Sequence, residues 1–234
     1  MTIIMHDLCG ADGRRFSPYC WRVRMALAHK GLDHETRPAG FLDIPKIAGG
    51  AFRTVPVLEH GDTVLAESWD IAVYLEKAFP DRPSLFGGEG GVAVSRFVQG
   101  WADGVLQPAV AGLVVRDIAE HLGPEDRKYF IESREARYGR SLDEVVAGRA
   151  ERVQGFRAGL IPLRRLLAHQ PFLGGEAPLY ADYVVFGAFM WARTISPFLL
   201  IADDDAIRPW LDRCLDLHDG LARNATGFYW KAAA

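Results

Sequence analysis

The spacing of apolar positions divides the chain into two unlike parts. Up to residue 85, short β-prone runs and amphipathic helical patterns follow one another in the order βαβ-ββα. The predicted strands lie near residues 2–8, 33–37, 54–58 and 63–65, and the predicted helices near 17–30 and 67–79. Farther along, only helical spacing recurs, over residues 93–122, 125–138, 141–169, 180–194 and 205–222. The pattern therefore predicts an α/β domain followed by an all-α domain.

The first predicted helix has clear start and stop signals. Ser17 is a favoured N-cap because its hydroxyl oxygen can accept a hydrogen bond from an unpaired backbone N–H. Pro18 suits the first helical position, since it has no N–H to leave unpaired. Gly31 marks the end, and apolar residues such as Trp21 and Met25 supply an inward face.

A hairpin and a second helix follow. Residues 59–62 separate two strand-like runs and end in Gly-Asp, which is typical of a hairpin turn. Pro56 is unusual within a strand, because proline cannot donate to the ladder, and it is expected at a strand start, at an edge or in a cis turn. Glu67 and Ser68 then begin a helical pattern that continues to Phe79.

A glycine-rich run separates the two parts. Four of the five residues from 87 to 91 are glycine, and such a run is not expected to hold a regular element. We therefore predict a first domain over residues 1–85, a linker over 86–92 and a helical domain over 93–234.

Composition excludes several classes of protein. The 234 residues are 49% hydrophobic and 24% charged, which is ordinary for a globular chain and excludes disorder. A net charge of −3 gives no broad positive field, so nucleic acid is not expected as a partner. The most apolar stretch, residues 183–202, carries Arg193 at its middle and predicts a buried helix and a turn, not a membrane span.

Cysteine usage and the first residues favour the cytoplasm. The start of the chain lacks the basic and apolar segments of a secretory signal. The three cysteines have no repeat spacing, so neither a disulfide framework nor a zinc site is expected, and the seven histidines show no metal-ligand spacing.

Three features of the first domain point to one ligand site: Ser17 at a helix start, the kink at Val55 and Pro56, and Glu67 with Ser68 at a second helix start. A helix N-terminus offers free N–H groups and roughly half a positive charge. Two such ends facing one cleft would suit an acidic peptide.

Residues 17–20 have the spacing of a C-x-x-C redox motif in which Ser17 replaces the first cysteine and Cys20 is kept. Without a thiol at position 17 no mixed disulfide forms there, but a hydroxyl can donate a hydrogen bond to the thiolate of a cosubstrate. Such a bond lowers the pKa of the thiol and increases the fraction of nucleophile near neutral pH. A plain helix cap is the alternative interpretation of Ser17.

Together these motifs resemble the cytosolic glutathione transferases, which have a thioredoxin-like N-terminal domain and an all-helical C-terminal domain. The resemblance covers nearly the whole chain. A narrower one is to the bacterial β-etherase and fungal etherase-like classes, whose members cleave lignin-derived aryl ethers or handle bulky aromatics. It is carried by residues 15–21, 29–31, 74–75, 81–83, 125–131 and 141–144.

The family resemblance implies glutathione as cosubstrate, no metal and a homodimer. It implies that Ser17 activates the glutathione thiol and that Val55, before a cis Pro56, pairs with the cysteinyl backbone. Glu67 and Ser68 would hold the γ-glutamyl end.

The remaining parts of the implied site are a cation and an apolar pocket. Arg53 or Lys46 would meet the glycyl carboxylate, since that end of the peptide needs a positive charge. Aromatic side chains would line the substrate site between the domains: Tyr19, Trp101 and Tyr138, with Phe97, Phe189 and Trp191 as further candidates.

Other positions favour structural roles. Cys20 is expected to pack inward, and the acidic run 203–205 suits a solvated helix start better than a cation site. Leu179 stands where family members commonly have Ser or Thr at a helix start, but Asp182 can still reach back to a backbone N–H. Cys9 is expected as a small core residue, with a second nucleophile as the alternative.

Two further hypotheses stand beside the transferase. One is a non-catalytic protein that binds glutathione or an apolar ligand between its domains. The other is a glutathione lyase or isomerase on the same fold, for which Cys9 would be the suspected thiol.

Overall fold

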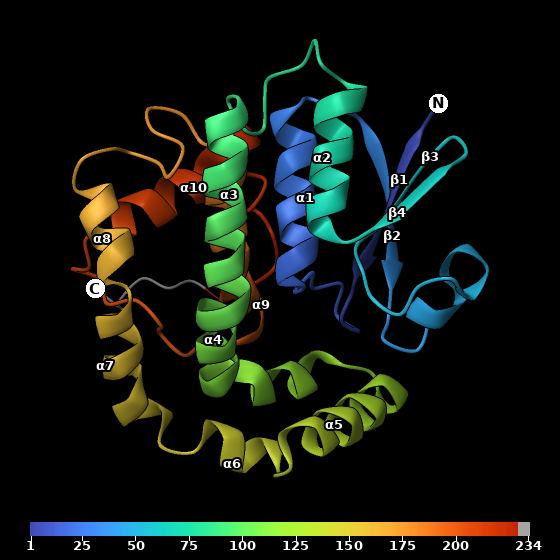
Figure 1. Ribbon diagram of the computed structural model, residues 1–234. Helices are drawn as coiled ribbons and strands as arrows, with labels where there is room; N and C mark the ends of the chain where they lie inside the picture. The colour runs from blue at the N-terminus through green and yellow to red at the C-terminus, as the bar shows by residue number, and fades with distance from the viewer. Residues whose placement is uncertain (229–234) are drawn as a thin grey trace.

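The first part of the chain folds around a small mixed sheet. The computed structural model describes residues 1–228 and has strands in the order β2-β1-β3-β4 (Figure 1). β1 runs parallel to β2 and antiparallel to β3, and β4 is antiparallel to β3. The strands are β1 (Ile3–Leu8), β2 (His34–Ala39), β3 (Val57–His60) and β4 (Thr63–Ala66). The predicted order βαβ-ββα is confirmed.

Two helices pack side by side between this sheet and the helical part of the chain: α1 (Pro18–His29) and α2 (Ser68–Ala78) (Figure 1). The start of α1 is as the sequence predicts, because the Cys20 N–H donates to Ser17 Oγ over 3.2 Å. A short 3₁₀ segment, η1 (Ile44–Gly50), lies on the connection from β2 to β3.

Two sequence predictions of local structure are wrong in detail. The strand predicted over 54–58 begins only at Val57, so Thr54, Val55 and Pro56 precede it. The glycine-rich run also contributes to a helix, since α3 begins at Glu89, within the predicted linker. The first turn of a helix tolerates such residues because its N–H groups need no intrahelical partner. The division into domains 1–85 and 93–234 stays a prediction.

The second part of the chain is all helical, as predicted. Residues 229–234 of the predicted second domain lie outside the described residues. The described elements are α3 (Glu89–Trp101), the π-helical turn η2 (Ala102–Leu106), α4 (Gln107–Val114), the 3₁₀ segment η3 (Val115–His121), α5 (Pro124–Tyr138), α6 (Leu142–Val146), α7 (Arg149–Gly159), α8 (Ile161–Leu167), α9 (Tyr180–Ile195) and α10 (Arg208–Gly220).

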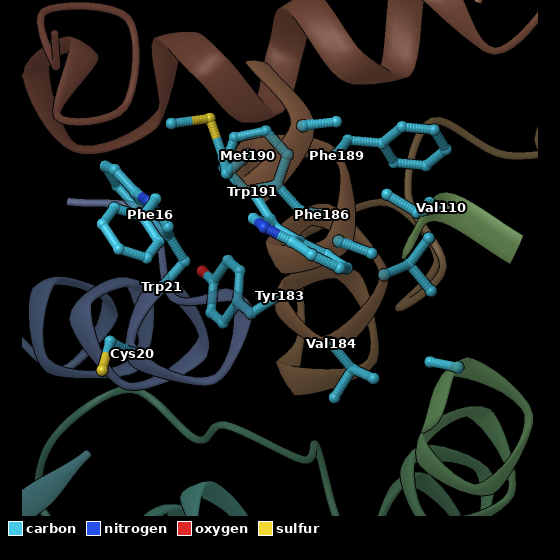
Figure 2. Packing of buried hydrophobic residues seen from close by; sticks show 14 of the residues in the cluster. Phe16, Cys20, Trp21, Val110, Tyr183, Val184, Phe186, Phe189, Met190 and Trp191 are labelled. Atoms are coloured by element: carbon cyan, nitrogen blue, oxygen red, sulfur yellow. The ribbon is translucent and has the colours of Figure 1, made fainter. Parts of the chain in front are cut away.

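Helix α9 is the centre of the molecule. All of its residues are buried, and Figure 2 shows its side chains between α1, which carries Trp21, and α4, which carries Val110. The predicted buried helix is therefore confirmed, and Arg193 within it donates to the carbonyls of Ala222 and Ala225. Within residues 1–228, no helix is long and apolar enough to cross a membrane.

Asp182 fixes the start of α9. Its buried carboxylate accepts from the N–H groups of Leu173, Gly174 and Leu179 at 2.7, 3.0 and 3.0 Å. The Trp210 indole N–H from α10 donates to the same carboxylate over 2.8 Å. The prediction that Asp182 reaches back to the backbone at Leu179 is confirmed.

The acidic run 203–205 also lies at a helix start. Asp205 accepts from the Ile207 N–H over 3.0 Å and pairs with Arg164 at 2.7 Å, just before α10 begins. This carboxylate therefore caps a chain turn and holds α8 to the start of α10, in line with the predicted structural role.

Candidate functional site

One large cavity lies between the N-terminal sheet domain and the helical part of the chain. Its volume is about 760 Å³, and the helical part lines it through α3, η2, α4, η3, α5 and α9. All three sequence features that point to a ligand reach this cavity. They are represented in its lining by Ser17, Val55, Pro56, Glu67 and Ser68.

Ser17 presents a buried hydroxyl to the cavity. Its side chain lines the cavity although the residue is only 4% exposed. The hydroxyl oxygen accepts the Cys20 N–H, which uses an acceptor lone pair and leaves the O–H proton to donate. Ser17 also lies at the positive end of α1. A negatively charged atom next to its hydroxyl is therefore stabilised both by a hydrogen bond and by the helix dipole.

The segment before β3 presents backbone to the cavity. Val55 and Pro56 are joined by a cis peptide bond, as the family resemblance implies. The ladder of β3 begins at Val57, so the N–H and C=O of Val55 are not used in it. An extended peptide in the cavity can therefore pair with Val55.

Glu67 and Ser68 form the second helix start. Glu67 has φ +68° and ψ 119°, a strained conformation for a residue with a side chain, and such strain gathers at ligand sites. Ser68 is buried at the first position of α2. The Tyr180 hydroxyl of α9 donates to the Ser68 carbonyl over 2.8 Å, and burial raises the pKa of Tyr180 to about 12, which keeps that donor protonated.

The two candidate cations differ in placement. Arg53 lines the cavity and is exposed. Lys46 lies outside the lining, where its ammonium pairs with Asp43 at 2.8 Å on the surface. Of the two, Arg53 is placed to meet a carboxylate inside the cavity.

Some of the aromatic candidates line the cavity and others lie elsewhere. Tyr19, Tyr138 and Trp191 line the cavity. Phe189 is buried in the core (Figure 2), and Phe97 is 77% exposed on α3. Trp101 lies in a second cavity of about 350 Å³ between η2, α4 and α7, together with Val105 and Phe156. The placement of Trp101 in the first cavity is therefore wrong, because its helix turns that side chain toward α7.

Sequence reasoning missed a polar cluster at the Tyr19 end of the cavity. Asp103, in the π-helical turn η2, accepts from Arg22 Nη2 over 2.6 Å and from Gln107 Nε2 over 2.7 Å. Burial raises the pKa of Tyr19, and the charges of Asp103 and Glu67 raise it further. A single π turn often marks a functional site, but the sequence gives no local signal for it.

A second missed group lies on α5, which closes the opposite end. Phe130, Arg134 and Arg137 line the cavity, and their spacing of four and three residues places them on one face of the helix. Phe41, from the loop after β2, stacks on Phe130 with ring centroids 5.4 Å apart. The spacing on α5 was visible in the sequence, whereas the contact with Phe41 was not.

The cysteines play no part in this cavity. Neither Cys9 nor Cys20 is in its lining, and burial raises the pKa of the Cys9 thiol. Cys20 is buried as predicted, and burial followed by the nearby Asp7 charge holds the pKa of its thiol well above the ordinary value. Within residues 1–228 no cluster of His, Cys, Asp and Glu is arranged to hold a metal ion.

Comparisons with known proteins agree on one family. The model of the glutathione S-transferase N-terminal domain matches residues 16–78, and that of the C-terminal domain matches residues 93–216. Glutathione S-transferase 1 of Dianthus caryophyllus is 29% identical over 153 residues, which are 63% of this chain and 69% of that protein.

Solved structures resemble the chain over most of its length. The glutathione transferase GSTFuA3 from Phanerochaete chrysosporium has a TM-score of 0.74 and 26% identity, over 94% of this chain and 92% of its own. A glutathione S-transferase of Ceriporiopsis subvermispora, solved in complex with glutathione, has a TM-score of 0.78 over 94% of this chain and 97% of its own. At 22% identity, the second similarity shows the fold alone.

Proposed function

The chain belongs to the glutathione S-transferase family, and from that premise we propose that it binds glutathione in the large cavity and transfers the glutathionyl group, through its sulfur, to an apolar or aromatic electrophile. Ser17 donates a hydrogen bond to the sulfur and stabilises the thiolate. The thiolate attacks an electrophilic carbon, a C–S bond forms, and the leaving group departs with the electron pair of the bond that breaks. The thiol proton goes to solvent.

One observation carries this proposal: two helix starts and the Val55 backbone, which lies outside the β3 ladder, face one cavity. The α1 start at Ser17 suits a thiolate, and the α2 start at Ser68 suits the α-carboxylate of the γ-glutamyl end. Val55 offers a backbone donor and acceptor to the cysteinyl residue, Glu67 a carboxylate to the α-amino group, and Arg53 a cation to the glycyl carboxylate.

The test compares Ser17→Ala with a matched serine variant. Ser141→Ala removes the N-cap of α6, whose hydroxyl accepts from the Glu144 N–H, at a serine outside the cavity lining. We expect Ser17→Ala to lower kcat/KM with an aryl halide by about 10- to 100-fold, since a hydrogen bond to a charged group contributes about 1.5–3 kcal/mol. Glutathione affinity by calorimetry should change little, and Ser141→Ala should keep full activity.

The outcomes separate the alternatives. Full activity in Ser17→Ala would remove the proposed role of its hydroxyl. Tight glutathione binding with no turnover of aryl halides, β-aryl ethers or peroxides would favour a carrier.

We also propose β-aryl ether cleavage as the finer activity. In this step the thiolate attacks the carbon that bears the aryl ether oxygen, the C–O bond breaks and a phenolate leaves. The aromatic lining formed by Phe16, Phe41 and Phe130 supports an aryl substrate. Release of a phenol from a model β-aryl ether, dependent on glutathione, tests it.

A homodimer in a reducing compartment such as the cytoplasm completes the proposal. Val94 and Phe97 on α3 are 54% and 77% exposed, which supports a covered apolar face in an assembly. The three cysteines are free, which fits a reducing compartment. Light scattering should give twice the chain mass, and Phe97→Glu should lower it to one chain.

A further inference from the structure

Charged side chains line the large cavity from several elements: Arg53, Glu67, Asp103, Arg134 and Arg137. Glu67 and Asp103 both act on Tyr19, so the acidic groups gather at that end. Arg134 and Arg137 line the end closed by α5. Asp103 is already paired with Arg22 at 2.6 Å, and Arg53 is assigned to the glycyl carboxylate, so the two arginines of α5 are positive charges of the lining that the proposed glutathione contacts do not use.

The two arginines of α5 have no counter-ion. Within residues 1–228 neither guanidinium pairs with a carboxylate, and Arg134 Nη1 donates a hydrogen bond to Ser133 Oγ over 3.2 Å. Arg149, by contrast, pairs with Asp117 at 2.7 Å. Burial lowers the pKa of Arg134, and the like charge of Arg137 lowers it further. An anion bound here would offset both the burial of the Arg134 charge and its repulsion from Arg137.

An aromatic wall stands beside these cations. The rings of Phe41 and Phe130 are stacked, and Tyr129 lies 6.3 Å from Phe41. The Arg134 guanidinium lies over both phenylalanines, 5.5 and 5.3 Å from the ring centroids. A flat ring on this wall would point an attached acidic group toward the guanidinium pair.

Helix α5 is held in place over the cavity. Asp126, near its start, accepts from the Leu42 N–H over 2.9 Å, and Leu42 follows Phe41 in the loop after β2. The aromatic wall and the two arginines are therefore held together, and this contact fixes the position of Arg134 and Arg137 relative to the N-terminal domain.

From the proposed function, on which this step rests, we infer that the electrophile is an aromatic acid. Its ring lies against Phe41 and Phe130, and its carboxylate pairs with Arg134 and Arg137. Arginine suits this role because its planar fork matches a carboxylate in two parallel hydrogen bonds.

The test uses two electrophiles with the same ring and leaving group: 4-(chloromethyl)benzoate and its methyl ester. In each, the thiolate displaces chloride from the benzylic carbon. Rates are divided by the uncatalysed rates with glutathione, which removes the intrinsic difference in reactivity. We expect the protein to prefer the acid by about 10-fold or more, and Arg137→Gln to lower the acid rate far more than the ester rate, which removes most of that preference. Arg137→Lys should keep part of it.

The control is Arg140→Gln, an exposed arginine three residues farther along that does not line the cavity. It should keep the preference for the acid. An equal rate for acid and ester in the unmodified protein would overturn the inference. So would weaker glutathione binding in Arg137→Gln at an unchanged acid-to-ester ratio, because the arginines would then serve the glycyl carboxylate.

A binding measurement separates this inference from the proposed function. Calorimetry with 4-methylbenzoate at saturating glutathione needs no turnover. Binding that is lost in Arg137→Gln and kept in Arg140→Gln supports the acid site even if neither electrophile reacts. Absence of binding to the unmodified protein contradicts it.

Discussion

The Tyr180 hydroxyl on α9 donates a hydrogen bond to the Ser68 carbonyl on α2 over 2.8 Å, so the helical part of the chain holds a residue of the proposed glutathione site in the sheet domain. Both residues are buried, and Trp69 packs against the Tyr180 ring at 5.9 Å. The position of the α2 start therefore depends on both parts of the chain.

Tyr180→Phe should weaken both stability and binding. Removing one hydrogen bond to a buried carbonyl should lower the free energy of unfolding by about 1 kcal/mol and reduce glutathione affinity, because Ser68 loses its support. Denaturant melts and calorimetry measure the two effects. Tyr74→Phe is the control: its hydroxyl lies 2.8 Å from His60 Nδ1 and outside the cavity lining, so its removal should leave glutathione affinity unchanged. Unchanged glutathione affinity in Tyr180→Phe would show that this contact does not position the site.

Gly187→Ala should destabilise the protein through the contact of α1 with α9. A Cβ at Gly187 would lie 2.4 Å from the Pro18 carbonyl oxygen, which belongs to the first turn of α1 and cannot shift alone. We expect a loss of about 1–3 kcal/mol in the free energy of unfolding. Gly155→Ala in α7 is the matched control, because no atom outside its own helix lies within 4 Å of the added Cβ. That variant should be neutral or slightly more stable, and equal losses in both would contradict the packing argument.

Two histidines make stability depend on pH. His29 Nδ1 and His218 Nε2 lie 2.7 and 3.3 Å from the Tyr183 hydroxyl. Burial lowers the pKa of both, and for His218 the neighbouring His29 lowers it further. The unfolded chain therefore binds more protons below its ordinary histidine pKa of about 6.5, so their contribution to stability is present above that pH and is lost as the pH falls.

The measurement is the denaturant midpoint at pH 8 and at pH 5.5. The unmodified protein should lose more stability between these values than His29→Gln/His218→Gln, in which neither position titrates. His169→Gln is the control, because His169 is exposed on the turn after α8 and takes no part in this cluster. If the double variant keeps the whole pH dependence, the cluster is not its source.

Cys9→Ser should retain activity. The Cys9 thiol bonds the Gly10 carbonyl over 3.1 Å, lies outside the cavity lining, and has a pKa raised by burial, so it is mainly protonated at neutral pH. Steady-state rates of glutathione transfer should match those of the unmodified protein. Loss of activity in a folded Cys9→Ser protein would instead favour a lyase that uses this thiol.

Local signals were enough to predict much of the fold. Ser17 with Pro18 marks the α1 start by chemistry that acts within one turn, and it holds in the structure. The same is true of Asp182, which needs only nearby N–H groups to cap α9. The glycine run was expected to hold no regular element, yet α3 begins at Glu89 within it, which residue preference alone does not predict.

The sequence predicted only those site residues that have a local sequence signal. Ser17, Val55 and Ser68 each belong to a turn or cap with its own sequence signal, and they meet at the cavity. Trp101 was misplaced because helical spacing shows that a residue faces inward, not which of two cavities it faces. The role proposed for Arg134 depends on its contact with the Phe41 ring, and Phe41 lies far from it in the sequence.

The central claim is that the Ser17 hydroxyl stabilises a glutathione thiolate, and ultraviolet difference absorbance of bound glutathione between pH 5 and 9 tests it most directly. The bound thiol should titrate below the ordinary thiol pKa of about 8.5, and Ser17→Ala should raise its pKa by about 1–2 units while Ser141→Ala leaves it unchanged. Identical thiolate titrations in the unmodified protein and Ser17→Ala would contradict the account.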